Sequence, residues 1–229
     1  MEQLIQKLKE LAVQYPLEQN FNWTLPISNP LTIPLSLSVL EQNLYLKHNF
    51  YSLLDSDSLT SRYWLIQEWG GIRSFKQNPK NDRLLLKFER ELKEGALTSS
   101  TFSVISSLSK VASFADHQAY AIYDSRVIYS LNWLLFKYAS LKEFYPQPIG
   151  RNVDITKYEL NTIFNLVNGP VMYKSHRVAY HDYCQLMKTF SIEVYGKKDP
   201  YWMEMLLFTL APNYIVADIK ESLSISLKY

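Results

Sequence analysis

Hydrophobic residues recur at helical spacing from the start of the chain. Within the first fifteen residues, the apolar side chains share one helical face and the charged side chains lie on the other. The apolar face consists of Leu4, Ile5, Leu8, Leu11 and Ala12. Pro16 closes the segment, because proline lacks the amide hydrogen that a helix interior requires. The pattern therefore predicts an amphipathic first helix.

Proline interrupts the helical pattern after this segment. Between residues 16 and 34 the chain carries prolines at positions 16, 26, 30 and 34, each of which fixes φ and removes a backbone donor. The aromatic and aliphatic residues between these prolines make the segment too apolar for a free linker. We therefore expect an ordered but irregular connection that lies across a helical body.

Helical spacing returns in five segments between residues 36 and 138. The segments run from Ser36 to about Tyr51, from near Ser61 to Gly70, from Asn81 or Asp82 to Gly95, from Thr98 to about Phe114, and from Asp124 to Tyr138. Asn81 or Asp82 is the expected N-cap of the third segment, and Asp124 is that of the fifth. Glycine ends the second and third segments.

In the last third of the chain, the sequence pattern predicts further helices after a turn-rich connection over residues 144–152. We expect them at about Ile155 to Leu166, at about Ser175 to Tyr195 and at Trp202 to Leu210, with Pro212 ending the last. Residues 215–227 form either a short helix or a terminal strand. The fold class is thus all-α, a compact multi-helix body over residues 1–229, with either one core or two packed lobes and a cleft between them.

Composition supports an ordered protein in a reducing compartment. Hydrophobic residues make up 47% of the chain and charged residues 20%, the balance of a globular protein. Cys184 is the single cysteine, which excludes an internal disulfide and the usual zinc motifs. The N-terminal residues do not resemble a signal peptide, and no stretch approaches the roughly 18 apolar residues of a membrane span. We therefore expect a cytoplasmic protein without a membrane partner.

Bulk charge and aromatic content leave the function open. The formal net charge is only +2, so bulk electrostatics imply neither nucleic acid nor an acidic partner. The chain contains 17 Tyr, 11 Phe and 5 Trp. These rings suit cores, interfaces and base-stacking surfaces alike, so the chemistry must be sought in local motifs.

One stretch combines residues that suggest a chemistry. Lys110 begins a short apolar turn, and Asp124 follows fourteen residues later at a helix-start position, within the order Ala-Ile-Tyr-Asp-Ser-Arg-Val at 121–127. Over about thirty residues this stretch resembles the helix-hairpin-helix DNA glycosylases, particularly the 8-oxoguanine glycosylase branch. In that family a nucleophilic lysine is followed by an aspartate in the pattern apolar, apolar, Asp, small or polar, basic, Val. The resemblance implies the same fold.

The resemblance also implies a DNA repair activity. The chain would act as a DNA N-glycosylase and AP lyase that excises a modified base through a lysine Schiff base, with DNA as its partner and no cofactor. Lys110 would be the nucleophile, and its amine must be neutral to attack. Asp124 would stabilise positive charge that develops on the sugar and manage protons. The target base would be flipped into an aromatic pocket.

Candidate DNA contacts surround this pair of residues. The family hairpin carries two glycines whose N–H groups approach a phosphate, but no glycine occurs between Gly95 and Gly150 in this chain. His117 and Gln118 stand at the corresponding place, where side chains would meet the phosphate instead. Arg126, in the helix after Asp124, is a further phosphate candidate. Arg151 and Asn152, in the proline-rich turn, complete the set.

Ordinary structural roles remain open for the same residues. Asp124 is equally a helix N-cap, Lys110 a solvated lysine near a helix end, and Arg126 a partner in a salt bridge. His176 and His181 lie five residues apart, a spacing that does not align two metal ligands on a helix, so we expect no metal site. The alternative function is a non-catalytic module that binds nucleic acid or protein and retains the glycosylase-like fold.

Overall fold

Helices account for nearly all of the regular structure, so the fold is all-α as expected. The structure is a computed structural model that describes residues 1–55, 58–139, 141, 143–150, 155 and 157–224. Its first part contains α1 (Glu2–Gln14), α2 (Leu17–Asn20), α3 (Val39–Asn49), α4 (Tyr51–Leu54), α5 (Thr60–Trp64), the π-helical η1 (Leu65–Trp69) and α6 (Pro79–Glu94). The middle contains α7 (Ser99–Phe102), α8 (Ile105–Ala115), α9 (Ser125–Leu134), the π-helical η2 (Leu135–Ala139) and β1 (Glu143–Phe144). The last part contains α11 (Leu160–Asn168), β2 (Met172–Tyr173), α12 (His176–Tyr195), α13 (Tyr201–Leu210), the π-helical η3 (Ala211–Ile215) and α14 (Val216–Ser222).

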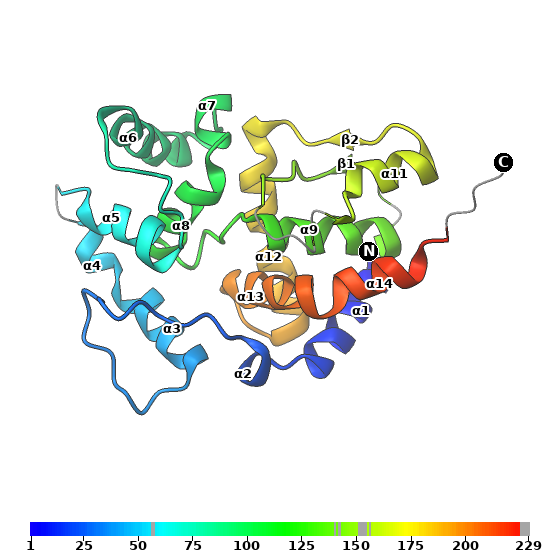
Figure 1. The fold of residues 1–229 in the computed structure, drawn as a ribbon, viewed down its shortest axis with the longest axis horizontal. Coiled ribbons are helices and arrows are strands. Elements are labelled where there is room, and N and C mark those ends of the chain that lie inside the picture. The colour runs from blue at the N-terminus through cyan, green and yellow to red at the C-terminus, as the bar shows by residue number, and fades with distance from the viewer. Residues whose placement is uncertain (56–57, 140, 142, 151–154, 156, 225–229) are drawn as a thin grey trace.

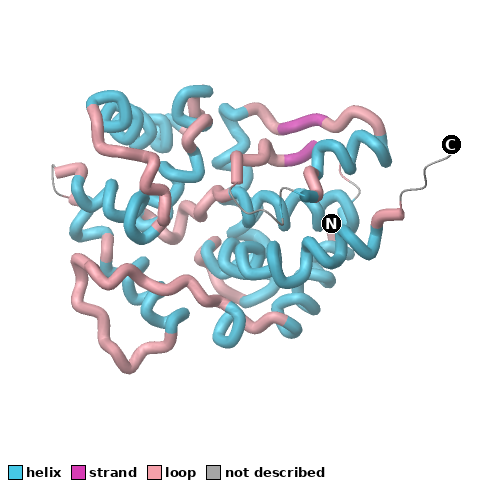
Figure 2. Tube along the Cα trace, in the orientation of Figure 1, coloured by secondary structure: helices cyan, strands magenta, loops and turns pink. Residues whose placement is uncertain are grey.

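The helices surround a central group formed by α9, α12 and α13, in which α13 packs against the other two. Figure 1 shows α5 and α6 at one end of the molecule and α11, with β1 and β2 beside it, toward the other. The irregular connection between α2 and α3 runs along the outside of the molecule as a long loop (Figure 2). None of the described helices has both the length and the apolar character needed to cross a membrane.

The N-terminal expectations agree with the structure. α1 buries Leu4, Leu8 and Leu11, the apolar face of the predicted amphipathic helix. The proline-rich connection contains the short α2, which the sequence pattern did not predict. Beyond α2 it is irregular and packs Trp23, among other residues, against the core. The apolar content of this segment is therefore explained by packing on the helical body.

The predicted start of one helix and the predicted continuity of another differ from the structure. The N-cap of α6 is Asn78, whose side-chain oxygen accepts the Lys80 and Asn81 N–H groups, rather than Asn81 or Asp82. Pro79 then takes the first helical position, where a missing N–H costs nothing. The predicted helix over residues 98–114 is two helices, α7 and α8, which are separated by a turn at Ser103 and Val104.

The helix predicted at Trp202 to Leu210 is present as α13, but the helical path does not end at Pro212. η3 carries the chain through this proline and into α14, and the Val216 N–H donates to the Ala211 carbonyl across the wide turn. A π-turn has i→i+5 hydrogen bonds, so it absorbs a residue that has no N–H to donate. Of the two forms left open for the final segment, the described residues adopt the helix.

The core consists of two hydrophobic clusters. The larger cluster joins residues of α1, α9, α12 and α13. The smaller cluster consists of Leu46, Phe50, Leu54, Leu65, Trp69, Phe114 and Ile122. It joins α3, α4 and η1 to the end of α8 and to the segment that follows α8. The α8–α9 connection therefore contributes to both clusters.

A short parallel pair of strands, which the sequence pattern did not predict, lies near α9. β1 pairs with β2 through Glu143 and Met172 and through Phe144 and Tyr173. Directly after β1, the Asn132 amide of α9 donates to the Tyr145 carbonyl at 2.8 Å and accepts the Tyr145 N–H at 3.0 Å. The Tyr123 hydroxyl donates to the Pro146 carbonyl at 2.8 Å. These bonds hold the segment after β1 beside the start of α9.

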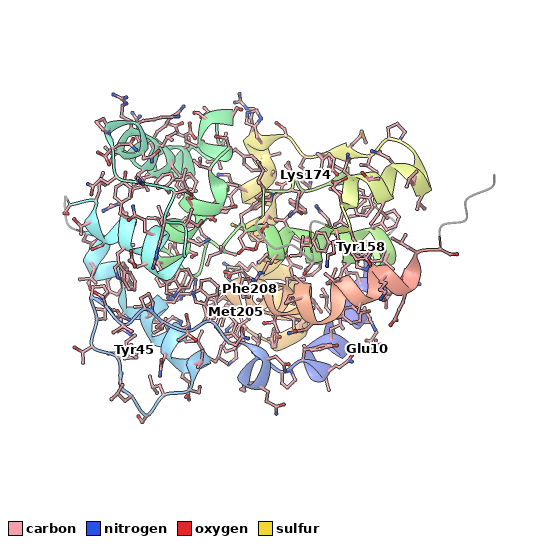
Figure 3. All side chains as sticks on the ribbon, in the orientation of Figure 1. Glu10, Tyr45, Tyr158, Lys174, Met205 and Phe208 are labelled. Atoms are coloured by element: carbon pink, nitrogen blue, oxygen red, sulfur yellow. The ribbon has the colours of Figure 1, made fainter. Side chains whose placement is uncertain are left out.

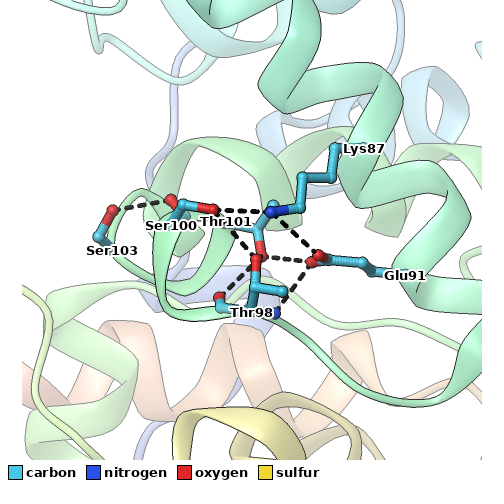
Figure 4. Close-up of polar contacts among 6 residues, drawn as sticks. All are labelled: Lys87, Glu91, Thr98, Ser100, Thr101 and Ser103. Atoms are coloured by element: carbon cyan, nitrogen blue, oxygen red, sulfur yellow. Dashed lines mark hydrogen bonds and ion pairs between the residues drawn. The ribbon is translucent and has the colours of Figure 1, made fainter.

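Glu91 holds α6 against α7 (Figure 4). It is buried, and its Oε2 accepts the Thr98 N–H at 3.1 Å and the Thr101 hydroxyl at 2.5 Å. Lys87 lies 3.6 Å from the other oxygen. Burial alone would raise the pKa of Glu91, but the bonds from Thr101 and Thr98 hold that pKa below its ordinary value. The ionised carboxylate thus stabilises the junction that leads into α8.

We predict that Glu91→Gln lowers the free energy of unfolding at neutral pH, because an amide accepts weaker bonds than a carboxylate. Since folding lowers the pKa of Glu91, its ionic contribution is complete above the ordinary glutamate value of about 4.3 and is lost as the pH falls through the folded pKa. Urea unfolding at a series of pH values should show the difference between wild type and variant shrinking in acid. Glu94→Gln, an exposed position in the same helix, is the control. A difference that stays constant with pH would contradict the prediction.

Candidate functional site

Lys110 lies in the middle of α8, a helix that is buried along most of its length. Its side chain is 5% exposed, and its Nζ donates to the Ser106 carbonyl one turn earlier at 2.8 Å. Gly70 allows this placement, because a β-carbon at Gly70 would overlap the side-chain carbons of Lys110. The alternative that Lys110 is a solvated lysine near a helix end is therefore wrong.

Burial governs the electrostatics of the Lys110 amine. Desolvation lowers the pKa of Lys110, while the negative charges of Asp124 and Glu204 oppose that change. The carboxylates act without a contact ion pair, since Lys110 forms no salt bridge among the described residues. A lysine whose pKa is lowered in this way has a larger neutral fraction, which is the nucleophilic form.

Asp124 caps α9 and also faces the same region as Lys110. Its Oδ1 accepts the N–H groups of Arg126 at 2.9 Å and Val127 at 3.0 Å, so the predicted cap is present. Both bonds use a single oxygen, which leaves Oδ2 for another partner among the described contacts. Capping and a role at the site are therefore compatible.

The segment Ala121–Tyr123 carries the chain from α8 to Asp124 through the interior without regular structure. Tyr180 and Tyr183 of α12 donate their hydroxyls to the carbonyls of Ala121 at 3.0 Å and Ile122 at 2.7 Å. The Ile122 N–H donates to Glu204 Oε2 at 3.0 Å, and the Tyr123 N–H donates to the Ser109 hydroxyl at 3.0 Å. Side chains from three helices thus satisfy this buried backbone and fix the position of Asp124.

Lys110 and Asp124 line one cavity of about 60 Å³, which we call the inner cavity. It lies where the two hydrophobic clusters meet, because Trp69 and Ile122 belong to one cluster and Phe21 and Met205 to the other. Figure 3 places Met205 and Phe208, two of its lining residues on α13, near the middle of the molecule. The polar side chains of the lining are Asn43, Lys47, Lys110, Asp124 and Glu204.

Four aromatic rings form the apolar wall of the inner cavity: Phe21, Trp23, Trp69 and Phe208. The two tryptophan rings meet edge to face at 6.1 Å, and Trp23 meets Phe208 in the same way at 5.6 Å. The Trp23 indole N–H donates to the Trp69 carbonyl at 3.0 Å. Asn43 accepts the Trp69 indole N–H at 3.1 Å and donates to the Trp23 carbonyl at 2.7 Å. The wall is therefore held in one arrangement.

Two further charged residues are buried in the inner cavity. Lys47, on α3, is 4% exposed, donates to the Ser113 hydroxyl at 3.2 Å and lies 4.5 Å from the centre of the Phe114 ring. Glu204, on α13, is 6% exposed. Burial lowers the pKa of Lys47 and raises the pKa of Glu204 to about 7. The cavity thus holds two lysines and two carboxyl groups at its surface.

An open groove of about 740 Å³ adjoins the inner cavity, and we call it the outer groove. Its lining comes from the residues after η1, from the α7–α8 junction and from residues 146–150. Gly70, Lys110 and Asp124 line both the groove and the cavity. These three residues therefore stand between the outer groove and the aromatic wall.

The predicted DNA contacts lie in different places. The Arg126 guanidinium is 4.8 Å from the centre of the Phe208 ring and forms no salt bridge among the described residues, so the proposed ion pair is replaced by a cation–π contact. The His117 Nδ1–H donates to Asp199 Oδ1 at 3.0 Å and the ring stacks on His48, while Gln118 is exposed. Neither lines the cavity or the groove. Arg151 and Asn152 lie outside the described residues.

Comparison with models of protein families, with curated proteins and with solved structures finds no match for the chain. Within the described residues, no group of three or more His, Cys, Asp or Glu side chains is placed to hold a metal ion. The arrangement of side chains in the cavity and the groove is therefore what bears on function.

Sequence reasoning missed Lys47, Glu204 and the aromatic wall. Glu204 is the one charged residue in the largely apolar sequence of α13, and a lone carboxyl group inside a core helix was the available signal. Lys47 carried no comparable signal, because it stands beside His48 and Asn49 at a helix end where a solvated lysine is ordinary. Its burial follows from the packing of α3 on α8.

We predict that Asp124→Ala lowers the free energy of unfolding by about 1 kcal/mol, the usual cost of losing an N-cap. Asp124→Asn should keep most of that stability, because the asparagine oxygen accepts the same two N–H groups while the charge is removed. Urea denaturation followed by circular dichroism measures both changes. Equal losses in the two variants would show that the charge of Asp124, rather than its cap, stabilises the fold.

Proposed function

We propose that the chain is a DNA glycosylase and AP-lyase-like protein that excises a modified base through a Schiff base on Lys110. The observation that carries the proposal is that Lys110 and Asp124 line both the inner cavity and the outer groove. A nucleotide flipped out of a duplex needs such an arrangement, with space for the base on one side of the reacting groups and space for the backbone on the other.

The local environment of Lys110 supports the proposed role as nucleophile. The lowered pKa of its amine increases the fraction that carries a free electron pair. In the reaction, Nζ bonds to the sugar C1′, the bond from C1′ to the base breaks, and its electron pair leaves with the base; Nζ then loses a proton, and the C1′–O4′ bond opens with a proton going to O4′, which gives the Schiff base. The carboxylate of Asp124 stabilises the positive charge that develops on the sugar during this exchange.

The aromatic wall supports the proposal for the base. Phe21, Trp23, Trp69 and Phe208 offer flat apolar faces, on which every nucleobase can stack. The cavity of about 60 Å³ has room for a few water molecules, so a base enters only as side chains move apart. The contact between the Lys110 amine and the Ser106 carbonyl must break at the same time, because that bond holds the amine back on its own helix.

We predict that borohydride reduction traps wild-type protein on duplex DNA that contains an abasic site, and that Lys110→Ala abolishes the cross-link. Only an amine that forms an imine with the sugar aldehyde is reduced to a stable bond. Gel electrophoresis measures the cross-link, and mass spectrometry of the digested adduct locates the modified lysine. Lys7→Ala, a change on the surface of α1, is the control and should cross-link like the wild type. A wild-type chain that never cross-links, or a Lys110→Ala variant that cross-links equally, would contradict the proposal.

A second candidate function is a non-catalytic module that binds nucleic acid. The observations that favour it are the small volume of the inner cavity and the engagement of the Lys110 amine by Ser106. In that case the groove would receive the DNA backbone and no base would reach Lys110.

The two functions differ in how DNA affinity depends on Lys110. For the binding module, we predict an affinity that falls steeply with salt, as for phosphate contacts in general, and that is the same for wild type and Lys110→Ala. Fluorescence anisotropy with labelled duplexes, undamaged and containing an abasic site, measures both affinities. A wild type that prefers the abasic duplex by more than tenfold and loses this preference in Lys110→Ala would contradict the binding-module function.

A further inference from the structure

Glu204 is a buried carboxyl group that the proposed reaction has not yet used. Its side chain, on α13, lines the inner cavity together with the aromatic wall and does not line the outer groove. Its neighbours in the lining include Met205 and Phe208 from the same helix. A base stacked on the aromatic wall would therefore share the cavity with this carboxyl group.

One oxygen of Glu204 is available to a ligand. Oε2 accepts the Ile122 N–H at 3.0 Å. Among the described contacts, this is the single hydrogen bond of the Glu204 carboxyl group. Lys47 attracts the carboxylate but forms no salt bridge with it among the described residues. Oε1 thus has no fixed hydrogen-bond partner in a cavity whose other walls are largely apolar, where a buried carboxyl oxygen favours a polar group of a ligand.

Several ionisable groups from four parts of the fold surround Glu204. They are Lys47 on α3, Lys110 on α8, Asp124 at the start of α9, and Tyr183 and Cys184 on α12. Burial, helped by the Asp124 charge, raises the pKa of Glu204 to about 7, against the attraction of the Lys47 cation and the Ile122 N–H. Near neutral pH, Glu204 therefore exists both as an acid and as a carboxylate.

We propose that Glu204 is the general acid that protonates the departing base, and that Lys47 is a positioning residue that sets the charge of Glu204. The proposal rests on the function proposed above. As the bond from the sugar C1′ to the base breaks, the base nitrogen gains an electron pair, and the proton on Glu204 Oε1 passes to the base. Glu204 becomes a carboxylate, Lys110 Nζ bonds to C1′, and the base leaves neutral.

The other ionisable groups in the cavity have different tasks. Lys110 supplies its electron pair to C1′, and Asp124 faces the groove as well as the cavity, at the side of the sugar. Lys47 is held by Ser113 and by the face of the Phe114 ring. Among the groups of the lining, Glu204 combines a free oxygen with a proton that it can give up at neutral pH.

The test compares a neutral base with a base that is already positively charged. N7-methylguanine carries a positive charge and needs no proton to depart, whereas 8-oxoguanine and uracil are neutral. Glu204→Gln keeps an oxygen for the Ile122 N–H and removes the proton donor. The neutral base used is the one that the wild type removes fastest. We expect Glu204→Gln to remove it about 10² to 10⁴ times more slowly than the wild type, the usual effect of losing a general acid. Its removal of N7-methylguanine should change by less than about fivefold.

Borohydride trapping at a preformed abasic site separates this proposal from the proposed function, because that reaction involves no departing base. Glu204→Gln should cross-link to an abasic duplex like the wild type. Equal slowing for neutral and charged bases, or a wild type that cross-links at abasic sites but removes no neutral base, would overturn the role of Glu204. A wild type that does not cross-link at abasic sites would overturn the function of Lys110 itself.

The pH profile provides the readout for Lys47. The wild-type rate on a neutral base should fall as the pH rises above about 7, where Glu204 loses its proton. Because the Lys47 cation lowers the pKa of Glu204, Lys47→Met should move this fall to higher pH. Glu204→Gln should lack the fall altogether. A Lys47→Met variant that is folded by circular dichroism and keeps the wild-type profile would overturn the positioning role.

Discussion

The buried backbone of Ala121–Tyr123 is the constraint on which the rest of the site depends. A chain that crosses a core without helix or strand leaves polar groups that cost free energy unless side chains bond to them. Tyr180 and Tyr183 reach its carbonyls, and Glu204 and Ser109 accept its N–H groups. Four side chains from α8, α12 and α13 are committed to one short segment, and their common result is a fixed position for the Asp124 cap.

This constraint also gives a structural reason for part of the tyrosine content. A phenol combines a large apolar ring with one hydroxyl, so it fills a core and still reaches a backbone carbonyl. Burial raises the pKa of Tyr180 and Tyr183 well above the ordinary value, which keeps both hydroxyls neutral donors. Phenylalanine at either position would fill the same space and leave a carbonyl without its bond. Part of the tyrosine content thus serves to bond the buried backbone of residues 121–123.

The sequence predicted the positions of helices better than it predicted which side chains pack together. Helix faces such as Leu4, Leu8 and Leu11 repeat at 3.6-residue spacing, and Asp124 stands at a cap position, so local pattern was enough for α1 and for the start of α9. It failed at Pro212, where a π-turn accepts a residue that normally ends a helix. The burial of Lys110 and Lys47 was beyond local pattern, because Gly70, Ser113 and Phe114 meet them only after the helices pack.

Burial acts on the acid and on the amine of the inner cavity in chemically complementary ways. Removal of water disfavours the charged form of any group, so the same surroundings favour a neutral Lys110 and a protonated Glu204. In water, each group is found mainly in the opposite state at neutral pH. Asp124 limits the change at Lys110, and Lys47 limits it at Glu204. In the proposed reaction, one desolvated cavity would thus serve both the nucleophile and the proton donor, and the nearby opposite charges, which form no salt bridge with either group among the described residues, would limit the effect.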